Sequence, residues 1–142
     1  MFVRQGLAFA VAFVGIAAAV LTTGCGSAHR AIPVVSITER DFRIRVPHVL
    51  PAGDVRLMVS NKGPVSHELV IVRAARERLP RLADGSTIDE EGLHEQVIAT
   101  VEPQRPGAQS SVVVHLVRGR YILLCNMAGH AAGGMLTSFR VR

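Results

Sequence analysis

Three side chains that bind soft metals lie close together near the end of the 142-residue chain. Four residues separate Cys125 from His130, and four more separate His130 from Met135. A second histidine, His67, lies far upstream and directly before an apolar run. A thiolate and a thioether select copper, and imidazole accepts both Cu(I) and Cu(II). These four residues therefore predict a site for one copper ion that carries single electrons.

Each of these side chains, taken singly, has an ordinary structural explanation. A cysteine at a strand end is usually a small buried side chain, and a methionine often fills a gap in a core. Zinc is the competing metal, but structural zinc sites prefer four cysteine or histidine donors. The chain has two cysteines, and Cys25 ends an apolar N-terminal segment, so only Cys125 is left for the site. A single cysteine excludes a binuclear copper centre held by two cysteines. The combination within one short loop therefore favours copper.

Short strands with turns between them are predicted to position these residues. Residues 42–46 alternate apolar and basic side chains, which places Phe42, Ile44 and Val46 on a buried face. Residues 68–72 are apolar enough for a central strand, so they would bring His67 to the loop. The number and spacing of the strands are typical of a β-sandwich. About eight are predicted, at 34–37, 42–46, 55–60, 68–72, 96–101, 111–116, 121–124 and 137–141.

Residues 73–92 are the part of the chain that least resembles a strand. Their first half is basic and their second half is acidic, and Pro80, Gly85 and Gly92 interrupt them. The acidic half lacks the alternating oxygen ligands, the central glycine and the closing glutamate of a calcium-binding loop. We therefore predict a solvated surface excursion with one helical turn.

The first 24 residues have the features of a signal peptide of the lipoprotein type. Arg4 precedes an uncharged apolar stretch, and small residues lead into Cys25, as in a bacterial lipobox. Cys25 is the expected lipidation site, residues 25–33 are the tether, and residues 34–142 are the folded domain. An uncleaved membrane helix is the alternative. Either anchor would hold the domain outside the cytoplasm, on the outer face of a bacterial cell membrane, which is the periplasmic side in a Gram-negative cell.

The formal net charge is +5, and removal of residues 1–24 would remove only Arg4, leaving 5 − 1 = +4. This positive charge indicates a solvated basic surface, an attraction to anionic lipid headgroups, or an acidic protein partner. Nucleic acid is not expected, because no basic run is interleaved with aromatic residues. A disulfide between Cys25 and Cys125 would fit the count of two cysteines, but lipidation and metal ligation each explain one of them better.

The end of the chain resembles the cupredoxins, the blue type 1 copper proteins. The resemblance rests on Gly119-Arg120-Tyr121, on the Cys-Asn-x-x-Gly-His-x-x-x-Gly-Met string at residues 125–135, and on Asn61-x-Gly63 before His67. The loop spacing is similar to that of sulfocyanin and of rusticyanin-like members. The resemblance implies a Greek-key β-sandwich, with His67, Cys125 and His130 as strong ligands and Met135 as the weak axial ligand.

The same resemblance points to two further features of the site. Glu68 stands where many relatives use Asn or Ser to tie the two ligand loops together, which it can also do by accepting main-chain N–H bonds. Residues 128–135 are nearly all small and apolar, so we expect a docking patch around His130 formed by Ala128, Ala131 and Ala132.

A one-electron carrier is the function that these features favour. Its expected partners are redox proteins such as a cytochrome, an oxidase or a dehydrogenase, and the protein itself is expected to be a monomer. A copper chaperone or storage protein at the same membrane is the alternative. An enzyme is not expected, because copper oxidases and nitrite reductases need further copper sites that scattered histidines do not supply.

Overall fold

Nine strands and one short 3-10 helix make up the described part of the chain, which comprises residues 31–40, 42–74, 79–83 and 85–142 of a computed structural model. The predicted signal peptide, Cys25 and most of the tether lie outside these residues. Within them, no helix combines the length and apolar character that crossing a bilayer requires. The elements are β1 (Val34–Arg40), β2 (Arg43–Arg45), β3 (Val49–Leu50), β4 (Gly53–Asn61), β5 (His67–Arg73), η1 (Glu91–Leu93), β6 (Val97–Gln104), β7 (Gln109–Leu116), β8 (Gly119–Leu124) and β9 (Leu136–Val141).

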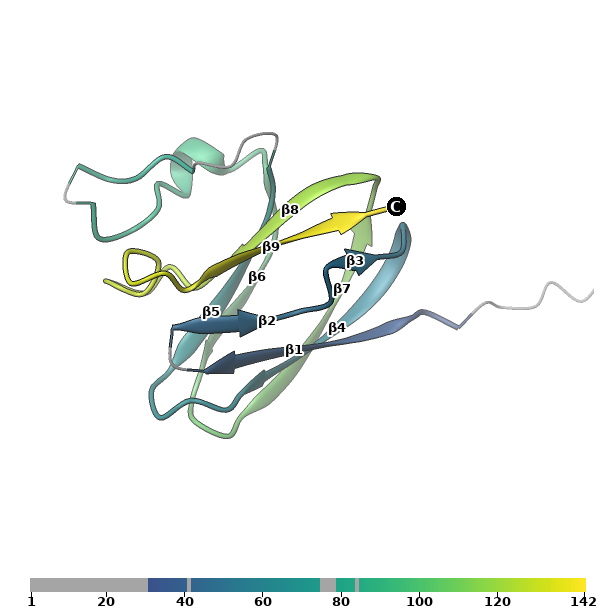
Figure 1. Ribbon diagram of the computed structural model, residues 1–142, viewed down its shortest axis with the longest axis horizontal. Helices are drawn as coiled ribbons and strands as arrows, with labels where there is room; N and C mark the ends of the chain where they lie inside the picture. Colours follow the sequence, from purple (N-terminus) through teal and green to yellow (C-terminus); the bar gives the residue numbers. More distant parts are fainter. Residues whose placement is uncertain (1–30, 41, 75–78, 84) are drawn as a thin grey trace, which may run out of the picture. The chain divides into compact units, whose positions relative to one another are not determined.

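The strands form two sheets that pack face to face (Figure 1). One sheet has the order β2-β1-β4-β7, and the other has the order β3-β9-β8-β5-β6. The pairs β1–β4 and β3–β9 are parallel, and the other pairs are antiparallel. The all-β Greek-key sandwich predicted from the sequence is confirmed. The ninth strand is β3, within a segment where the sequence predicts only a turn.

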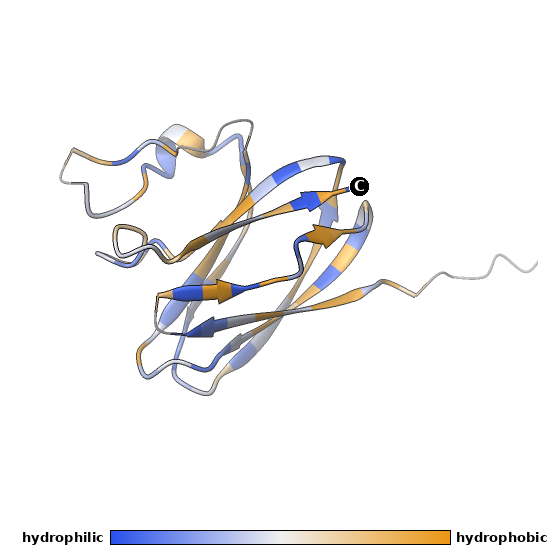
Figure 2. Ribbon diagram, in the orientation of Figure 1, coloured by the Kyte–Doolittle hydropathy of each residue, from blue (hydrophilic) through white to orange (hydrophobic). Residues whose placement is uncertain are grey.

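The core between the two sheets is formed by side chains at every second position of the strands. In β4, Val55, Leu57 and Val59 are fully buried, whereas the residues between them are partly exposed. Hydrophobic and hydrophilic residues likewise alternate along β2 in Figure 2. Tyr121 on β8 stacks on Phe139 of the neighbouring strand β9, with 5.2 Å between ring centroids.

The turn between β1 and β2 departs from the predicted pattern at one residue. Ile44 is buried as predicted, but Phe42 is 47% exposed, so its predicted inward position is wrong. Phe42 has a φ of 59°, which turns its side chain out of the strand alternation. The β1–β2 turn therefore presents an aromatic ring at the surface.

The excursion between β5 and β6 covers the outer face of a sheet. β5 is buried on both faces, because Leu69 and Ile71 face the central core while Val70 and Val72 join a second apolar cluster. The excursion contributes Ile88 and Leu93 to this second cluster, and both are at least nine-tenths buried. The structure has a helical turn at η1, and most described residues of the excursion are exposed or partly exposed as predicted, but Ile88 and Leu93 are buried instead of solvated.

Candidate metal centre

The loop between β8 and β9 carries three of the four predicted ligands. Cys125 directly follows β8, and Met135 directly precedes β9. The Cys125 N–H donates to the Met135 carbonyl at 3.1 Å, and the Met135 N–H donates to the His130 carbonyl at 2.9 Å. These bonds close the loop on itself, so the antiparallel pairing of β8 with β9 fixes where its side chains can lie.

The fourth predicted ligand, His67, is the first residue of β5. β5 pairs with β8 through Val70 opposite Leu124, so the start of β5 lies beside the end of β8. Asn61 holds the loop that leads to His67. Its Nδ2 donates to the carbonyls of Val65 at 2.7 Å and Gln104 at 2.8 Å, and its Oδ1 accepts from the Gly63 N–H at 2.8 Å.

The ligand atoms of His67, Cys125 and His130 all lie within 4.8 Å of one another. His130 Nδ1 is 3.2 Å from Cys125 Sγ and 3.3 Å from His67 Nδ1. Bonds from divalent first-row metals to imidazole nitrogen and thiolate sulfur are about 2.0–2.3 Å long. One ion can therefore contact both atoms of each pair, and the donors fit a copper ion in kind and in spacing.

Met135 completes the donor set on the buried side of the loop. Its side chain is fully buried in the same apolar cluster as Cys125. Met127 packs against this cluster and is only partly buried. A thioether held in an apolar environment suits a weak axial ligand to a soft metal.

Gly63 fixes the orientation of the His67 ring. A Cβ atom at this position would lie 2.8 Å from His67 Nε2 and 3.3 Å from Asn61 Oδ1, which is too close for a side chain. The Nε2 edge of the ring therefore rests against the Gly63 main chain, and the Nδ1 edge faces Cys125 and His130. A neutral imidazole held in one orientation is what a metal ligand requires.

The electrostatics around Cys125 involve two acidic residues, of which Glu39 is buried and Glu68 is partly exposed. Burial raises the pKa of the Cys125 thiol above its ordinary value, and main-chain N–H groups of Glu68 and Met127 act in the opposite direction. The charges of Glu68 and Glu39 raise this pKa further. Metal binding requires the thiolate, so copper uptake must release this proton.

Glu68 follows His67 and lies next to the Cys125 loop. Burial raises the pKa of its carboxyl group, the charges of Glu90 and Glu102 add to this shift, and a hydrogen bond from the main chain of Asn126 opposes it. Through its own N–H and its carboxylate, Glu68 thus contacts both Cys125 and the next residue of the ligand loop.

Asn126 connects the ligand loop to the excursion, a role that was not predicted although this residue is part of the Cys-Asn-x-x-Gly-His string. Its Oδ1 accepts from the Ile88 N–H at 2.6 Å, and its Nδ2 donates to the Ile88 carbonyl at 3.0 Å and to Glu90 Oε1 at 2.7 Å. A polar residue directly after a candidate ligand is the only signal that the sequence offers for this role.

The second residue that sequence reasoning missed is Glu39, on β1. It is fully buried, and neither carboxyl oxygen has a hydrogen-bond partner among the described residues. Burial, together with the charge of Glu68, raises its pKa from 4.5 to about 7. Glu39 lies on the same inward face of β1 as Val35 and Ile37. The spacing of these three residues in the sequence did indicate that Glu39 faces inward.

The predicted docking patch is only partly at the surface. Ala128 and Ala132 are exposed, but Ala131 is 1% exposed and packs into the second apolar cluster, so its predicted place in the patch is wrong. His130 is partly exposed. Phe42 lies edge-on to the His130 ring, with 5.2 Å between centroids and an interplanar angle of 69°.

Three solved structures share the fold of this chain at low sequence identity. An auracyanin from Roseiflexus castenholzii is 20% identical over 80% of this chain and 99% of that protein, with a TM-score of 0.59. Auracyanin A from Chloroflexus aurantiacus, a "blue" copper protein, is 18% identical over 77% and 98%, with a TM-score of 0.57. Rusticyanin from Thiobacillus ferrooxidans is 19% identical over 77% of each chain, with a TM-score of 0.55.

The fold, the donor set and the family to which residues 24–142 belong together define a cupredoxin, with one type 1 copper ion as its cofactor. No curated protein is significantly similar to the chain. Residues 24–142 match the Sulfocyanin (SoxE) domain. The chain belongs to this sulfocyanin family of blue copper proteins, and such proteins carry electrons.

Proposed function

We propose that the protein is a membrane-anchored one-electron carrier of the extracytoplasmic space. In this proposal His67, Cys125 and His130 are the strong copper ligands and Met135 is the weak axial ligand. The observation that carries the proposal is the convergence of His67, Cys125 and His130 within 4.8 Å at one end of a rigid sandwich.

The bound copper supplies a centre that cycles between Cu(I) and Cu(II). The protein keeps the ligands in place during this cycle, because Asn61 fixes the His67 loop and Glu68 and Asn126 fix the Cys125 loop. Ligands that cannot rearrange keep the reorganisation between the two oxidation states small. The apolar surroundings of Cys125 and Met135 exclude water and favour the less charged state.

His130 is the ligand from which an electron would leave the protein. It is the only one of the four predicted ligands that is not buried in the described structure. The exposed residues beside it, Ala128 and Ala132, leave room for a partner to approach. The partner would be a redox protein such as a cytochrome, an oxidase or a dehydrogenase.

The anchoring part of the proposal rests on the sequence alone. The apolar segment before Cys25 and the short tether would keep the domain next to the outer face of the cell membrane. Such a protein would exchange electrons with partners at the same membrane.

The visible spectrum of the copper-loaded protein tests this function. We expect an intense band from thiolate-to-copper charge transfer that disappears on reduction and returns on oxidation. Cys125→Ser should abolish the band, whereas Cys25→Ser should retain it, because only Cys125 belongs to the donor set. A colourless protein that binds zinc equally well, or that loses copper to a mild chelator, would instead indicate copper handling.

A further inference from the structure

Phe42 is held in an unusual main-chain conformation next to His130. It is the only residue other than glycine with a positive φ in the described chain, at 59°. A bulky L-residue rarely adopts this left-handed conformation. It places a ring that is 47% exposed edge-on to the partly exposed His130 ring. Strain of this kind is concentrated at functional sites.

The ligand loop is shaped to receive this ring. A Cβ atom at Gly133 would lie 2.9 Å from Cδ1 of Phe42 and 3.1 Å from the Gly129 carbonyl oxygen. Only a glycine at this position lets the Phe42 ring rest on the loop. Phe42 therefore extends the surface at His130 with an aromatic group from a different part of the chain.

A basic cleft lies beside the β1–β2 turn that carries Phe42. It has a volume of about 620 Å³ and is lined by Thr38, Arg40, Arg43, Arg45 and Lys62. Every charged residue among those that line it is a cation. The sequence of the turn also contains Asp41, so the formal charge of this group of side chains is 4 − 1 = +3.

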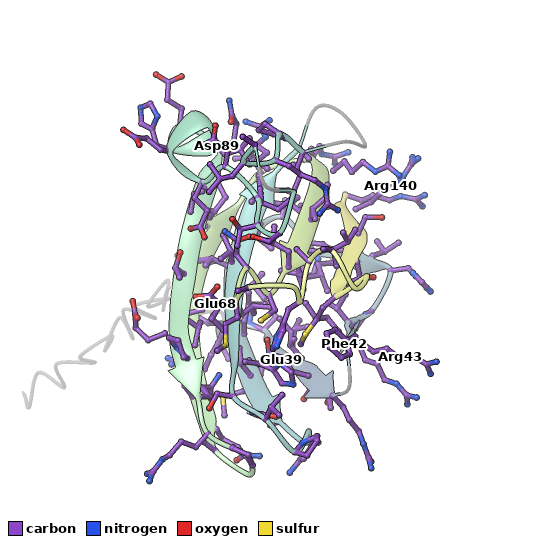
Figure 3. All side chains as sticks on the ribbon, turned by 90° about the vertical axis from the view of Figure 1, so that its left-hand side faces the viewer. Glu39, Phe42, Arg43, Glu68, Asp89 and Arg140 are labelled. Carbon is purple, nitrogen blue, oxygen red and sulfur yellow. The ribbon has the colours of Figure 1, made fainter. Side chains whose placement is uncertain are left out.

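The charges around the site are distributed asymmetrically. Figure 3 looks onto the end of the sandwich that carries the ligand loop, with Phe42 near the centre and Arg43 and Arg140 on its right. Glu68 and Asp89 lie on the other side of the site (Figure 3). A partner with a negative patch would be drawn to the Phe42 side and turned into one orientation.

We propose that Phe42 and the basic cleft form the docking surface for an acidic redox protein, which places carboxylates in the cleft and its own redox centre against Phe42 and His130. This inference rests on the proposed function and names the chemistry of the partner. Arginine side chains bind carboxylates in a bidentate geometry, and opposite surface charges accelerate encounter.

The position of the cleft favours a protein partner over a lipid surface. An anionic membrane could bind the same cations, but it offers no redox centre to a ring that is packed against a copper ligand. Phe42 directly precedes Arg43, which lines the cleft, so a surface that engages the cations also covers the predicted exit for the electron.

Electron transfer from reduced cytochrome b5, an acidic haem protein, tests this inference on the copper-loaded full chain. We expect the second-order rate constant to fall at least about tenfold as salt is raised, since screening removes the steering. The double variant Arg43→Glu, Lys62→Glu should lose about tenfold at low salt. Phe42→Ala should slow transfer but preserve the salt dependence, because the cations remain.

A matched control variant makes the same change of charge at the other end of the sandwich. Arg118→Glu, Arg142→Glu alters exposed residues near the β7–β8 turn and the end of β9, and it should leave the rate nearly unchanged. All variants should keep the charge-transfer band, which shows that they are folded and hold copper.

Binding is measured separately, from NMR shifts of the labelled, reduced protein on titration with cytochrome b5. Shifts that centre on Phe42, Arg43 and Lys62 support the inference even if no electron is transferred, an outcome that would count against the proposed function alone. Fast transfer that responds neither to salt nor to Arg43→Glu, Lys62→Glu would overturn the inference and leave the carrier function intact. Cleft-dependent binding to phosphatidylglycerol vesicles, with an unchanged cytochrome rate, would overturn it in favour of lipid.

Discussion

The Glu39 carboxyl group lies inside the sandwich, close enough to Cys125 to affect the pKa of its thiol. Ionised, it would be a buried charge without a hydrogen-bond partner among the described residues, which is costly. The folded protein avoids this cost by keeping the proton, and the pKa of Glu39 rises to about 7. The folded chain therefore binds this proton more tightly than the unfolded chain does.

This difference predicts how stability depends on pH in the metal-free protein. Between pH 4.5 and about 7, the folded state holds the Glu39 proton and the unfolded state releases it. Stability should therefore fall as pH rises through this window and level off above it. The shift of 7 − 4.5 = 2.5 corresponds to at most about 3 kcal/mol. Urea unfolding at pH 4.5 and at pH 8 measures the effect.

Glu39→Gln isolates the contribution of this one carboxyl group. Glutamine has nearly the same shape and does not titrate, so the variant should gain stability relative to the native protein at pH 8 but not at pH 4.5. Metal-free protein is needed, because a copper ion nearby would itself stabilise the carboxylate. Parallel pH profiles for the two proteins would mean that folding does not raise the pKa of Glu39.

The metal ligands could be predicted from residue type and spacing because few chemistries use one cysteine, two histidines and a methionine. The positions of Phe42 and Glu39 could not be predicted in the same way. Phe42 itself has the left-handed conformation, which turns its side chain away from the buried face. The alternation of buried and exposed side chains along β2 does not extend to Phe42, which directly precedes the strand. Glu39 has the phase of a core residue, but its charge argues against burial.

The excursion between β5 and β6 is an element whose role depends on contacts that sequence patterns do not report. Its charged residues predict a solvated loop, yet Ile88 and Leu93 are buried against Val70 and Val72. The unbroken apolar run of β5 was the available signal, because a strand buried on both faces needs a cover on its outer face. The strands themselves were easier to predict, since alternation is a local property.

Asn126 is predicted to hold the excursion between β5 and β6 against the ligand loop. Asn126→Ala removes three hydrogen bonds to Ile88 and Glu90, for an expected loss of about 2 kcal/mol of local stability. Hydrogen exchange at the Ile88 amide should then be about 30-fold faster. The charge-transfer band should broaden or shift as the Cys125 loop gains freedom.

Glu90→Ala is the matched partial change, because it removes only one of these three hydrogen bonds. It should accelerate exchange at Ile88 far less than Asn126→Ala does. Unchanged exchange in Asn126→Ala would mean that apolar packing alone keeps the excursion in place.

At the scale of the whole molecule, the metal site joins segments that lie far apart in the sequence. His67 opens β5, whereas Cys125 and Met135 flank the β8–β9 connection. A ligand that binds only the folded state stabilises it by mass action, by about 2.7 kcal/mol when its free concentration is 100 times its dissociation constant. Copper should therefore raise the unfolding temperature by about 10 °C.

Thermal unfolding followed by circular dichroism at several buffered Cu(I) concentrations measures this effect. The unfolding temperature should increase with the logarithm of free copper, and Cys125→Ser should show a much smaller increase. A copper-independent unfolding temperature in the native sequence would mean that the ion does not bind the folded state preferentially.

The position of β9 has a consequence for how the protein is made. β9 lies inside its sheet, paired with both β3 and β8, although it is the last of the strands to leave the ribosome. A nascent chain that ends before Val141 lacks the partner that β3 and β8 need, and Met135 and His130 are held by the same connection. We therefore expect the metal site to form only after β9 has paired with β3 and β8, so that copper binds once this sheet is complete.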